Sequence, residues 1–224
     1  HASAYFGHSV SLNEDGNTLV VGSWEEKNSA PASGAAYVFT RMAGNWSQQA
    51  YIKSSIVGCC DHFGDSVSLS ADGNTLAVGA FTRAGASGFV WSGSVYVFIR
   101  SGSEWIQQAQ LEASNTDVPV YEGDEFGGSV SLSANGNTLA IGAQREDSNA
   151  KGVDGDQSDN SADQAGAVYV FERSGREWSQ QSYIKASNTD RDDWFGRSVS
   201  LSADGNTLAV GALYEDSKAT GTNG

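Results

Sequence analysis

The chain has 224 residues and a formal net charge of −14, from 13 Lys and Arg against 27 Asp and Glu. A surface this acidic repels phosphate backbones and anionic lipid heads, which argues against nucleic-acid binding and membrane-surface binding. Hydrophobic residues make up 39% of the chain, enough for a folded core, and no apolar run approaches the roughly 20 residues that span a bilayer.

One segment recurs four times along the chain, each time opened by a Phe-Gly pair. The last copy begins at Phe195 and reads FGRSVSLSADGNTLAVGA, and the earlier copies begin at Phe6, Phe63 and Phe126. The copies are 57, 63 and 69 residues apart, a period typical of stacked or radial arrays of supersecondary units. The chain is therefore predicted to be an array of repeat units rather than a set of unrelated domains.

Each Phe-Gly pair is predicted to open a new unit. The resulting division is the end of a preceding unit in 1–5, three complete blades in 6–62, 63–125 and 126–194, and the first half of a fourth blade in 195–224.

The residue pattern of each complete unit predicts four consecutive strands, and no stretch shows the periodicity of a helix. The first strand follows the Phe-Gly pair and alternates apolar residues with serines, as Val199 and Leu201 do in the last copy. A tight turn, Asp72-Gly73-Asn74 in the second unit, then leads into a small apolar strand of the form TLAVGA. Such turns are strong hairpin signals because Gly adopts a positive φ without steric cost.

The third and fourth predicted strands indicate how the sheets pack. In the third strand Val168 and Val170 share one face of the sheet. Tyr169 and Phe171 share the other face, so both faces are apolar, whereas a sheet with one wet face alternates apolar and polar residues. The fourth strand starts with a Trp and a Gln pair and is polar, as an outer edge should be. The pattern predicts an all-β fold, a β-propeller of four-stranded antiparallel blades stacked around an axis.

The Phe-Gly opening, the Val-Gly-Ala segment and the Gly-Ala-Val-Tyr-Val-Phe third strand resemble FG-GAP repeats. That family includes the head of integrin α subunits and many bacterial surface and secreted proteins, and the SLSADGNTLAVGA and WSQQ segments are more similar to its bacterial members. The resemblance covers nearly the whole chain. It implies a seven-bladed propeller, an extracellular or cell-surface setting, and adhesion or ligand recognition through the loops.

The units present amount to about three and a half blades, because the fourth unit contains only its first two predicted strands. An incomplete ring would leave apolar blade faces and strand edges exposed, which promotes aggregation. We therefore expect the remainder of the propeller to come from a longer polypeptide that contains this chain, or from other copies or partner chains.

The resemblance also implies calcium, which many FG-GAP units bind in an Asp-rich loop between the first two strands. The Ser70–Thr75 turn departs from that pattern, because it is short and offers Asp72 as its one charged ligand. These turns are interpreted as plain hairpin turns.

A better candidate metal site lies in the long Glu146–Gly166 loop of the third unit. Ca²⁺ prefers six to eight oxygen ligands, and the loop contains four candidate ligands: Asp154, Asp156, Asp159 and Asn160. A solvated acidic loop without metal is the alternative.

Acidic residues also precede two of the Phe-Gly pairs, in Glu122–Glu125 and Asp190–Asp193. They are candidates to line one end of the ring, or they are charged loops on a wet face. The Cys59-Cys60 pair at the corresponding place in the first unit has three interpretations: a strained disulfide, a bridge to a neighbouring chain, or a reduced pair.

The six Trp residues fall into two groups. Three hold one repeated position and are predicted to pack: Trp46, Trp105 and Trp178. The other three lie in loops or at strand ends, where they would stack on sugar rings or fill blade junctions: Trp24, Trp91 and Trp194.

Catalysis has no motif to rest on, because the only histidines are His1, His8 and His62 and no nucleophile-base arrangement recurs. The sequence therefore predicts a non-catalytic extracellular binding or adhesion module that recognises a protein or carbohydrate ligand through its inter-strand loops. Two alternatives stay open: a structural repeat unit of a surface layer, filament or larger assembly, and the propeller domain of a carbohydrate-active enzyme.

Overall fold

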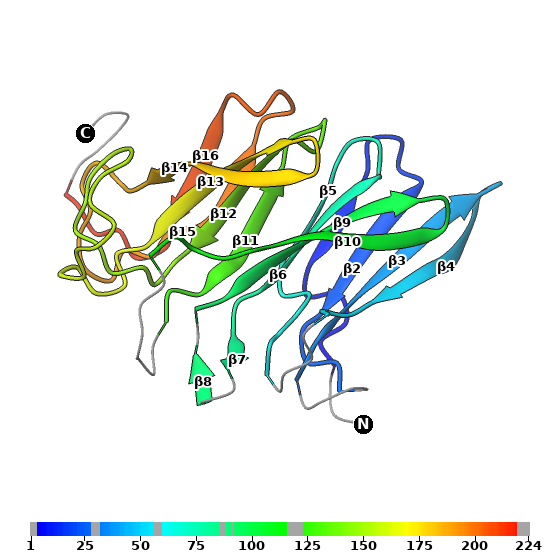
Figure 1. Cartoon of the computed structure of the whole chain (residues 1–224), viewed down its shortest axis with the longest axis horizontal. Coiled ribbons are helices and arrows are strands. Elements are labelled where there is room, and N and C mark those ends of the chain that lie inside the picture. Colours follow the sequence, from blue (N-terminus) through cyan, green and yellow to red (C-terminus); the bar gives the residue numbers. More distant parts are fainter. Residues whose placement is uncertain are drawn as a thin grey trace.

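The computed structural model describes residues 4–27, 32–55, 60–85, 88–90, 92–115 and 123–218. Three four-stranded sheets and one two-stranded sheet stand side by side along the molecule, and we name them blades 1 to 4 in chain order (Figure 1). Blade 1 contains β1 (Val10–Leu12), β2 (Thr18–Ser23), β3 (Ala35–Met42) and β4 (Asn45–Ile52). Blade 2 contains β5 (Val67–Leu69), β6 (Thr75–Ala80), β9 (Ser94–Ser101) and β10 (Glu104–Leu111). Blade 3 contains β11 (Phe126–Leu132), β12 (Thr138–Ala143), β13 (Ala167–Ser174) and β14 (Glu177–Ile184), and blade 4 contains β15 (Phe195–Leu201) and β16 (Leu208–Ala212).

The strands of each blade form an antiparallel meander in chain order. A small extra hairpin, β7 (Arg83–Gly85) and β8 (Gly88–Val90), lies in the connection between β6 and β9, and nothing in the sequence pattern predicts it. The described residues contain no helix, which confirms the all-β prediction. In this part of the chain there is accordingly no helix long and apolar enough to cross a membrane.

The apolar cores lie between the blades. Val95 and Val97 of β9 belong to the cluster shared with blade 3. Tyr96 and Phe98 of the same strand belong to the cluster shared with blade 1. Alternate residues of one strand thus face opposite neighbours, as expected for a sheet with two buried faces. The predicted β-propeller of about three and a half blades is confirmed.

A repeated set of hydrogen bonds joins the inner strands of successive blades. The first serine after each Phe-Gly pair donates to the Gly carbonyl of the next blade: Ser9 to Gly64 at 2.9 Å, Ser66 to Gly127 at 2.7 Å and Ser129 to Gly196 at 2.8 Å. The second serine accepts from a Leu backbone N–H of the next blade: Ser11 from Leu69 at 2.9 Å, Ser68 from Leu132 at 3.0 Å and Ser131 from Leu201 at 2.9 Å. Backbone N–H groups in the turns donate to the next blade's carbonyls: Glu14 to Ala71 at 3.1 Å, Ala71 to Ala134 at 2.9 Å and Ala134 to Ala203 at 2.9 Å. We call this set the inner ladder.

A glycine in each second strand permits this close approach. A Cβ placed on Gly79 would lie 2.0 Å from the carbonyl oxygen of Gly127, and one placed on Gly142 would lie 2.0 Å from that of Gly196. No side chain fits in either place. The Gly of the repeated Val-Gly-Ala segment is therefore required by the packing of one blade against the next.

A second repeated contact joins the blades nearer their outer edge. A β-bulge in β10 leaves Gln108 without a partner in the strand ladder, which turns its side chain toward the neighbouring blade. Its Oε1 accepts a hydrogen bond from Trp178 Nε1 of blade 3 at 3.1 Å. Gln49 accepts from Trp105 Nε1 at 3.3 Å between blades 1 and 2. The repeated Trp residues therefore bridge blades through a hydrogen bond in addition to packing.

The Asp-Gly-Asn segments form the predicted hairpin turns. Gly73 has a φ of 67°. Asp72 Oδ1 accepts hydrogen bonds from Ser70 Oγ at 2.5 Å and from Asn74 N at 3.0 Å. The carboxylate is thus used inside the turn, in agreement with the interpretation of these segments as plain turns.

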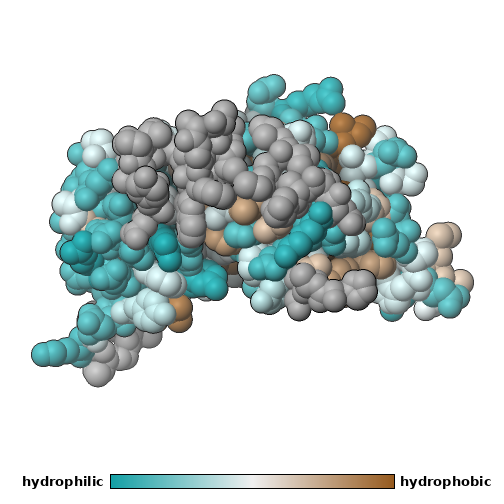
Figure 2. Space-filling model, turned by 90° about the horizontal axis from the view of Figure 1, so that it is seen from below, coloured by the Kyte–Doolittle hydropathy of each residue, from teal (hydrophilic) through white to brown (hydrophobic). Residues whose placement is uncertain are grey.

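The connections of unequal length leave the blades at the lower end of the sheets in Figure 1, opposite the short Asp-Gly-Asn turns. We call this end the lower face. Figure 2 views the molecule from below, and among the described residues hydrophilic ones prevail while hydrophobic ones form separate spots.

Candidate functional site

A small pocket lies where the lower ends of the inner strands meet. It has a volume of about 150 Å³ and is lined by His8, Trp24, Asp65, Phe81, Glu125, Gly128, Gln144 and Arg197. All four blades contribute to it. We call it the axial pocket.

Four of its residues occupy one position of the repeat, directly after the Phe-Gly pair: His8, Asp65, Gly128 and Arg197. The residues around this position, Phe-Gly before it and Ser-Val-Ser-Leu after it, are identical in the four copies. A repeated frame thus directs four chemically different residues toward one space. Groups placed on a rigid scaffold in this way can carry specificity.

The residue before each Phe has a left-handed backbone conformation. The φ angles are 51° at Tyr5, 54° at His62, 57° at Glu125 and 56° at Trp194. Such values are uncommon for residues of these types. Their recurrence shows that the Phe-Gly turn imposes the conformation, and it places Glu125 in the wall of the axial pocket.

An acid-base pair lies at the mouth of the pocket. His8 Nε2 is 3.1 Å from Asp65 Oδ1, and the Asp65 side chain is mostly buried. Burial raises the pKa of Asp65 to about 6, although His8 and Arg197 act to lower it. The folded protein therefore holds a carboxylate that is harder to ionise than an exposed one.

The pocket lining also offers two polar atoms without hydrogen-bond partners among the described residues. Glu125 Oε1 lies 3.2 Å from Arg145 Nε, and its Oε2 accepts a hydrogen bond from Gln144 Nε2. Gln144 Oε1 and Trp24 Nε1 are buried and have no hydrogen-bond partner among the described residues. Buried polar atoms are nearly always paired. An acceptor and a donor without partners in a pocket wall suit a ligand that both donates and accepts hydrogen bonds.

Aromatic rings surround Trp24 in the pocket lining. Trp24 stacks on Tyr5 with ring centroids 4.9 Å apart and meets the edge of His62 at 4.6 Å. His62 in turn stacks on Phe81 at 4.9 Å. Burial lowers the pKa of His62 to about 4, so its imidazole is neutral near pH 7. Trp24 therefore fills a blade junction and also borders the pocket.

The other two non-repeated Trp residues have different outcomes. Trp194 packs edge-on against Tyr214 at 4.8 Å, and the Arg145 guanidinium lies 5.6 Å from the Trp194 ring centroid. Trp91 lies outside the described residues, so its predicted role stays a prediction.

The four predicted metal ligands lie in the connection between β12 and β13. Each carboxylate accepts a backbone N–H: Asp154 from Tyr183 at 2.9 Å, Asp156 from Ser158 at 2.9 Å and Asp159 from Ser161 at 2.8 Å. Asn160 is exposed. Within the described ranges, no three His, Cys, Asp or Glu residues are grouped so as to hold a metal ion. Both the predicted calcium site and the alternative, a solvated acidic loop without metal, therefore stay open.

The acidic residues before the Phe-Gly pairs have different positions in the structure. Glu125 lines the axial pocket, whereas Asp193 is buried and accepts a hydrogen bond from Asp190 N at 2.8 Å. Glu122 and Cys59 lie outside the described residues. The three interpretations of the Cys59-Cys60 pair therefore stay open.

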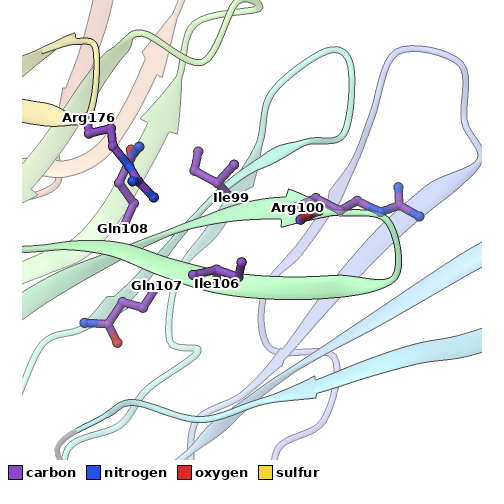
Figure 3. Close-up of a pocket in the computed structure, with 7 residues that line it drawn as sticks. Ile99, Arg100, Ile106, Gln107, Gln108 and Arg176 are labelled. Carbon is purple, nitrogen blue, oxygen red and sulfur yellow. The ribbon is translucent and has the colours of Figure 1, made fainter.

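A larger hollow, about 320 Å³, lies at the outer edge between blades 2 and 3 (Figure 3). It is lined by Ile99, Arg100 and Ser101 of β9, Ile106, Gln107 and Gln108 of β10, and Arg176 of the turn before β14. Ile106 is 54% exposed, so this is an open furrow along a blade junction. Gln108 of this furrow already accepts a hydrogen bond from Trp178. We therefore take the axial pocket, rather than the furrow, as the candidate site.

The stacked blades and the pocket at the end of their axis define a β-propeller with a polar site on one face. The family model for the FG-GAP repeat matches residues 1–39, 46–98, 105–171 and 178–224. The chain therefore belongs to the FG-GAP repeat family. A search of curated protein sequences found no significant match.

Two solved structures are among those that a structural comparison found to be similar to this chain. TolB from Acinetobacter baumannii is 14% identical with a TM-score of 0.48, over 90% of this chain and 36% of TolB. Sqt1 from Saccharomyces cerevisiae is 12% identical with a TM-score of 0.48, over 87% of this chain and 39% of Sqt1. The chain thus spans well under half the length of each of these proteins.

Proposed function

We propose that this chain is a non-catalytic binding or adhesion module of an extracellular or cell-surface protein, and that its lower face recognises a protein or glycan ligand. Membership of the FG-GAP family supports the setting, because these repeats are typical of extracellular and surface proteins. The axial pocket supports the role.

The observation that carries the proposal is the convergence of His8, Asp65 and Arg197 from three different blades on one pocket. These residues differ although the repeat around them is constant. Asp65 is kept mostly buried in spite of the unfavourable free energy of burying a carboxylate. A purely structural role requires neither the variation at this position nor the burial of a carboxylate.

The chemistry of the pocket indicates the kind of group that it accepts. Its 150 Å³ suits one sugar hydroxymethyl group or one polar side chain rather than a whole ligand. Trp24 Nε1 would donate to such a group, and Gln144 Oε1 would accept from it. The surrounding loops of the lower face would supply the remaining contact area.

Glycan and protein arrays, each probed with the purified chain, test the proposal. We expect binding on one array, and we expect Asp65→Asn and Arg197→Ala to reduce that binding at least about tenfold, or about 1.4 kcal/mol. Glu104→Gln is the matched control, because Glu104 is exposed at the start of β10, outside the pocket lining.

Two results would contradict the proposal. The absence of binding on both arrays would favour the alternative role as a structural repeat unit. Unchanged binding by both pocket variants would show that the ligand binds outside the axial pocket.

A further inference from the structure

The furrow at the outer edge between blades 2 and 3 lies inside the stack of described blades. Blade 2 packs on blade 1 through a shared apolar cluster, and blade 3 is joined to blade 4 by the hydrogen bond from Ser129 to the Gly196 carbonyl. The two blades that form the furrow therefore each have a further blade on their other side. None of the residues that line the furrow lines the axial pocket.

Two isoleucines form the apolar part of the furrow. Ile99 of β9 and Ile106 of β10 lie directly opposite each other in the strand ladder, and Ile106 is exposed. The corresponding pairs in the other complete blades are polar: Thr40 and Ser47 in blade 1, and Glu172 and Ser179 in blade 3. Blade 2 thus presents an aliphatic pair where its neighbours present polar side chains. The packing of the blades does not require this difference, because the other blades pack without it.

Arg176 adds a cation to the furrow. The same position, two residues before the repeated Trp, is Gly44 in blade 1 and Ser103 in blade 2. Arg176 is exposed, and no hydrogen bond or ion pair joins its guanidinium to another described residue. Arg100 is used differently, because its Nη1 donates to Thr18 Oγ1 of blade 1 at 3.4 Å. In Figure 3 the Arg100 side chain accordingly points away from Arg176.

The guanidinium and the isoleucine pair together indicate the chemistry of a ligand. A guanidinium pairs well with a carboxylate, which it can bind through two parallel hydrogen bonds. Ile99 and Ile106 favour an aliphatic group, because contact with it removes apolar surface from water. The chain has a net charge of −14, so a ligand with a run of carboxylates would be repelled. The furrow therefore suits one carboxylate next to an aliphatic group.

The edge of blade 2 favours a peptide as the carrier of these groups. β10 is the outermost strand of its sheet, so among the described residues no strand pairs with its outer edge. Backbone N–H and C=O groups at such an edge can bond to an extended main chain. A fatty acid has the carboxylate and the alkyl chain but no groups that use this edge. The edge strands β4 and β14 lack the isoleucine pair, which singles out β10.

We propose that the furrow is a docking site for an extended peptide segment of a partner protein. An aliphatic side chain of the segment packs on Ile99 and Ile106, and one carboxylate of the segment pairs with Arg176. The main chain of the segment runs along the outer edge of β10. The segment would bind whether or not the axial pocket holds a ligand.

Substitutions that restore the residues of the other blades remove the site and keep the repeat. Ile99→Thr, Ile106→Ser and Arg176→Ser introduce the residue types that stand at Thr40, Ser47 and Ser103. Met42→Ser is the matched control, because Met42 is 77% exposed at the end of β3 in blade 1 and the same position is Ser in blades 2 and 3. Circular dichroism verifies that each variant is folded.

A phage-displayed library of random peptides tests the proposal. The library is depleted on the triple variant and then panned on the wild-type chain. We expect the enriched peptides to share one Asp or Glu next to aliphatic residues. Fluorescence anisotropy with a synthetic peptide of the enriched sequence should show affinities at least about tenfold weaker for Arg176→Ser and for Ile106→Ser. The affinity of Met42→Ser should equal that of the wild type.

Three results would overturn the proposal. The first is that no peptide is enriched on the wild-type chain, and the second is an enriched sequence without an acidic residue. The third is an enriched peptide that Arg176→Ser and Ile106→Ser bind as tightly as the wild type does. Dodecanoate is titrated in parallel. If it binds in the absence of any enriched peptide, and Arg176→Ser loses that binding, the furrow is a fatty-acid site instead.

Discussion

Trp178 Nε1 donates a hydrogen bond to Gln108 Oε1 across 3.1 Å, from blade 3 to blade 2. Trp105 and Gln49 repeat this contact one blade earlier. The Arg173 guanidinium lies over the Trp178 ring, 5.6 Å from its centroid, and adds a cation–π contact. The outer parts of the blades are thereby tied together where the inner ladder does not reach.

Replacing Trp178 by Phe keeps an aromatic ring and removes the Nε1–H donor. We expect the free energy of unfolding, measured by urea denaturation, to fall by about 0.5–1.5 kcal/mol more than in a matched control. The control is Trp46→Phe, because Trp46 holds the same position in blade 1 and no blade precedes it among the described residues. Equal losses at the two positions would show that the bridge contributes nothing.

The blade architecture could be predicted from the sequence because the repeat states it four times. A two-sided apolar pattern around Val168 and Tyr169 identifies a strand with two buried faces. The Trp-Gln bridge could not be predicted, because it depends on a bulge at Gln108 that residue types alone do not specify.

The axial pocket could not be predicted from the sequence for a related reason. The loops of unequal length contain the predicted ligands Asp154, Asp156 and Asp159, whose carboxylates each accept a hydrogen bond from a backbone N–H. The pocket is formed instead at a position inside the constant segment, the one position between Phe-Gly and Ser-Val-Ser-Leu that differs in every copy. The variation at this one position is the feature of the sequence that points to the pocket. Its meaning depends on the geometry that brings His8 and Asp65 within 3.1 Å.

Lys185 and Glu146 form a buried ion pair in blade 3. Lys185 Nζ lies 2.7 Å from Glu146 Oε2, and their side chains are 0% and 1% exposed. Burial lowers the pKa of Lys185, although Glu146 acts to raise it. Asn115 Nδ2 also donates to Glu146 at 3.0 Å, which connects the pair to the end of blade 2.

Lys185→Met removes the cation and leaves the Glu146 carboxylate buried without its partner. We expect a loss of about 3–5 kcal/mol in unfolding free energy by chemical denaturation. The double variant Lys185→Met with Glu146→Gln removes both charges and should recover a large part of that loss. A double variant as unstable as the single one would contradict this account.

The β12–β13 connection yields a prediction about calcium. Because the carboxylates of Asp154, Asp156 and Asp159 are each bonded to a backbone N–H, calcium would have to compete with these bonds. We expect the same thermal midpoint in EDTA and in calcium at about 1 mM, the upper range for extracellular modules. A midpoint raised by calcium in the wild type, and not in Asp156→Asn, would show that the loop rearranges to bind the ion.

Asp65 yields a prediction about pH. Its pKa in the folded chain is about 6, above the usual 3.8, because the carboxyl is buried. The folded state therefore holds the proton more tightly than the unfolded state between these values, and stability is lost as the pH rises through about 6. Asp65→Asn cannot ionise and escapes this loss. We expect the variant to be more stable than the wild type near pH 7.5 by about 1–3 kcal/mol, since one pKa unit is worth about 1.4 kcal/mol.

The advantage of Asp65→Asn should shrink as the pH falls from about 6 to about 4, because the folded wild-type chain retains its proton in this range while the unfolded chain is still largely ionised, and it should level off below the unfolded pKa of 3.8. His62 has the opposite effect, because its pKa of about 4 lies below the usual 6.5 and stability is lost as the pH falls through this window. Both chains carry His62, so its contribution cancels in the difference between them.

Urea denaturation of the wild-type and Asp65→Asn chains at several pH values measures the difference in their unfolding free energies. An advantage that does not vary with pH would mean that the amide packs better for reasons unrelated to charge. A variant less stable near pH 7.5 would mean that His8 and Arg197 stabilise the carboxylate more than burial disfavours it.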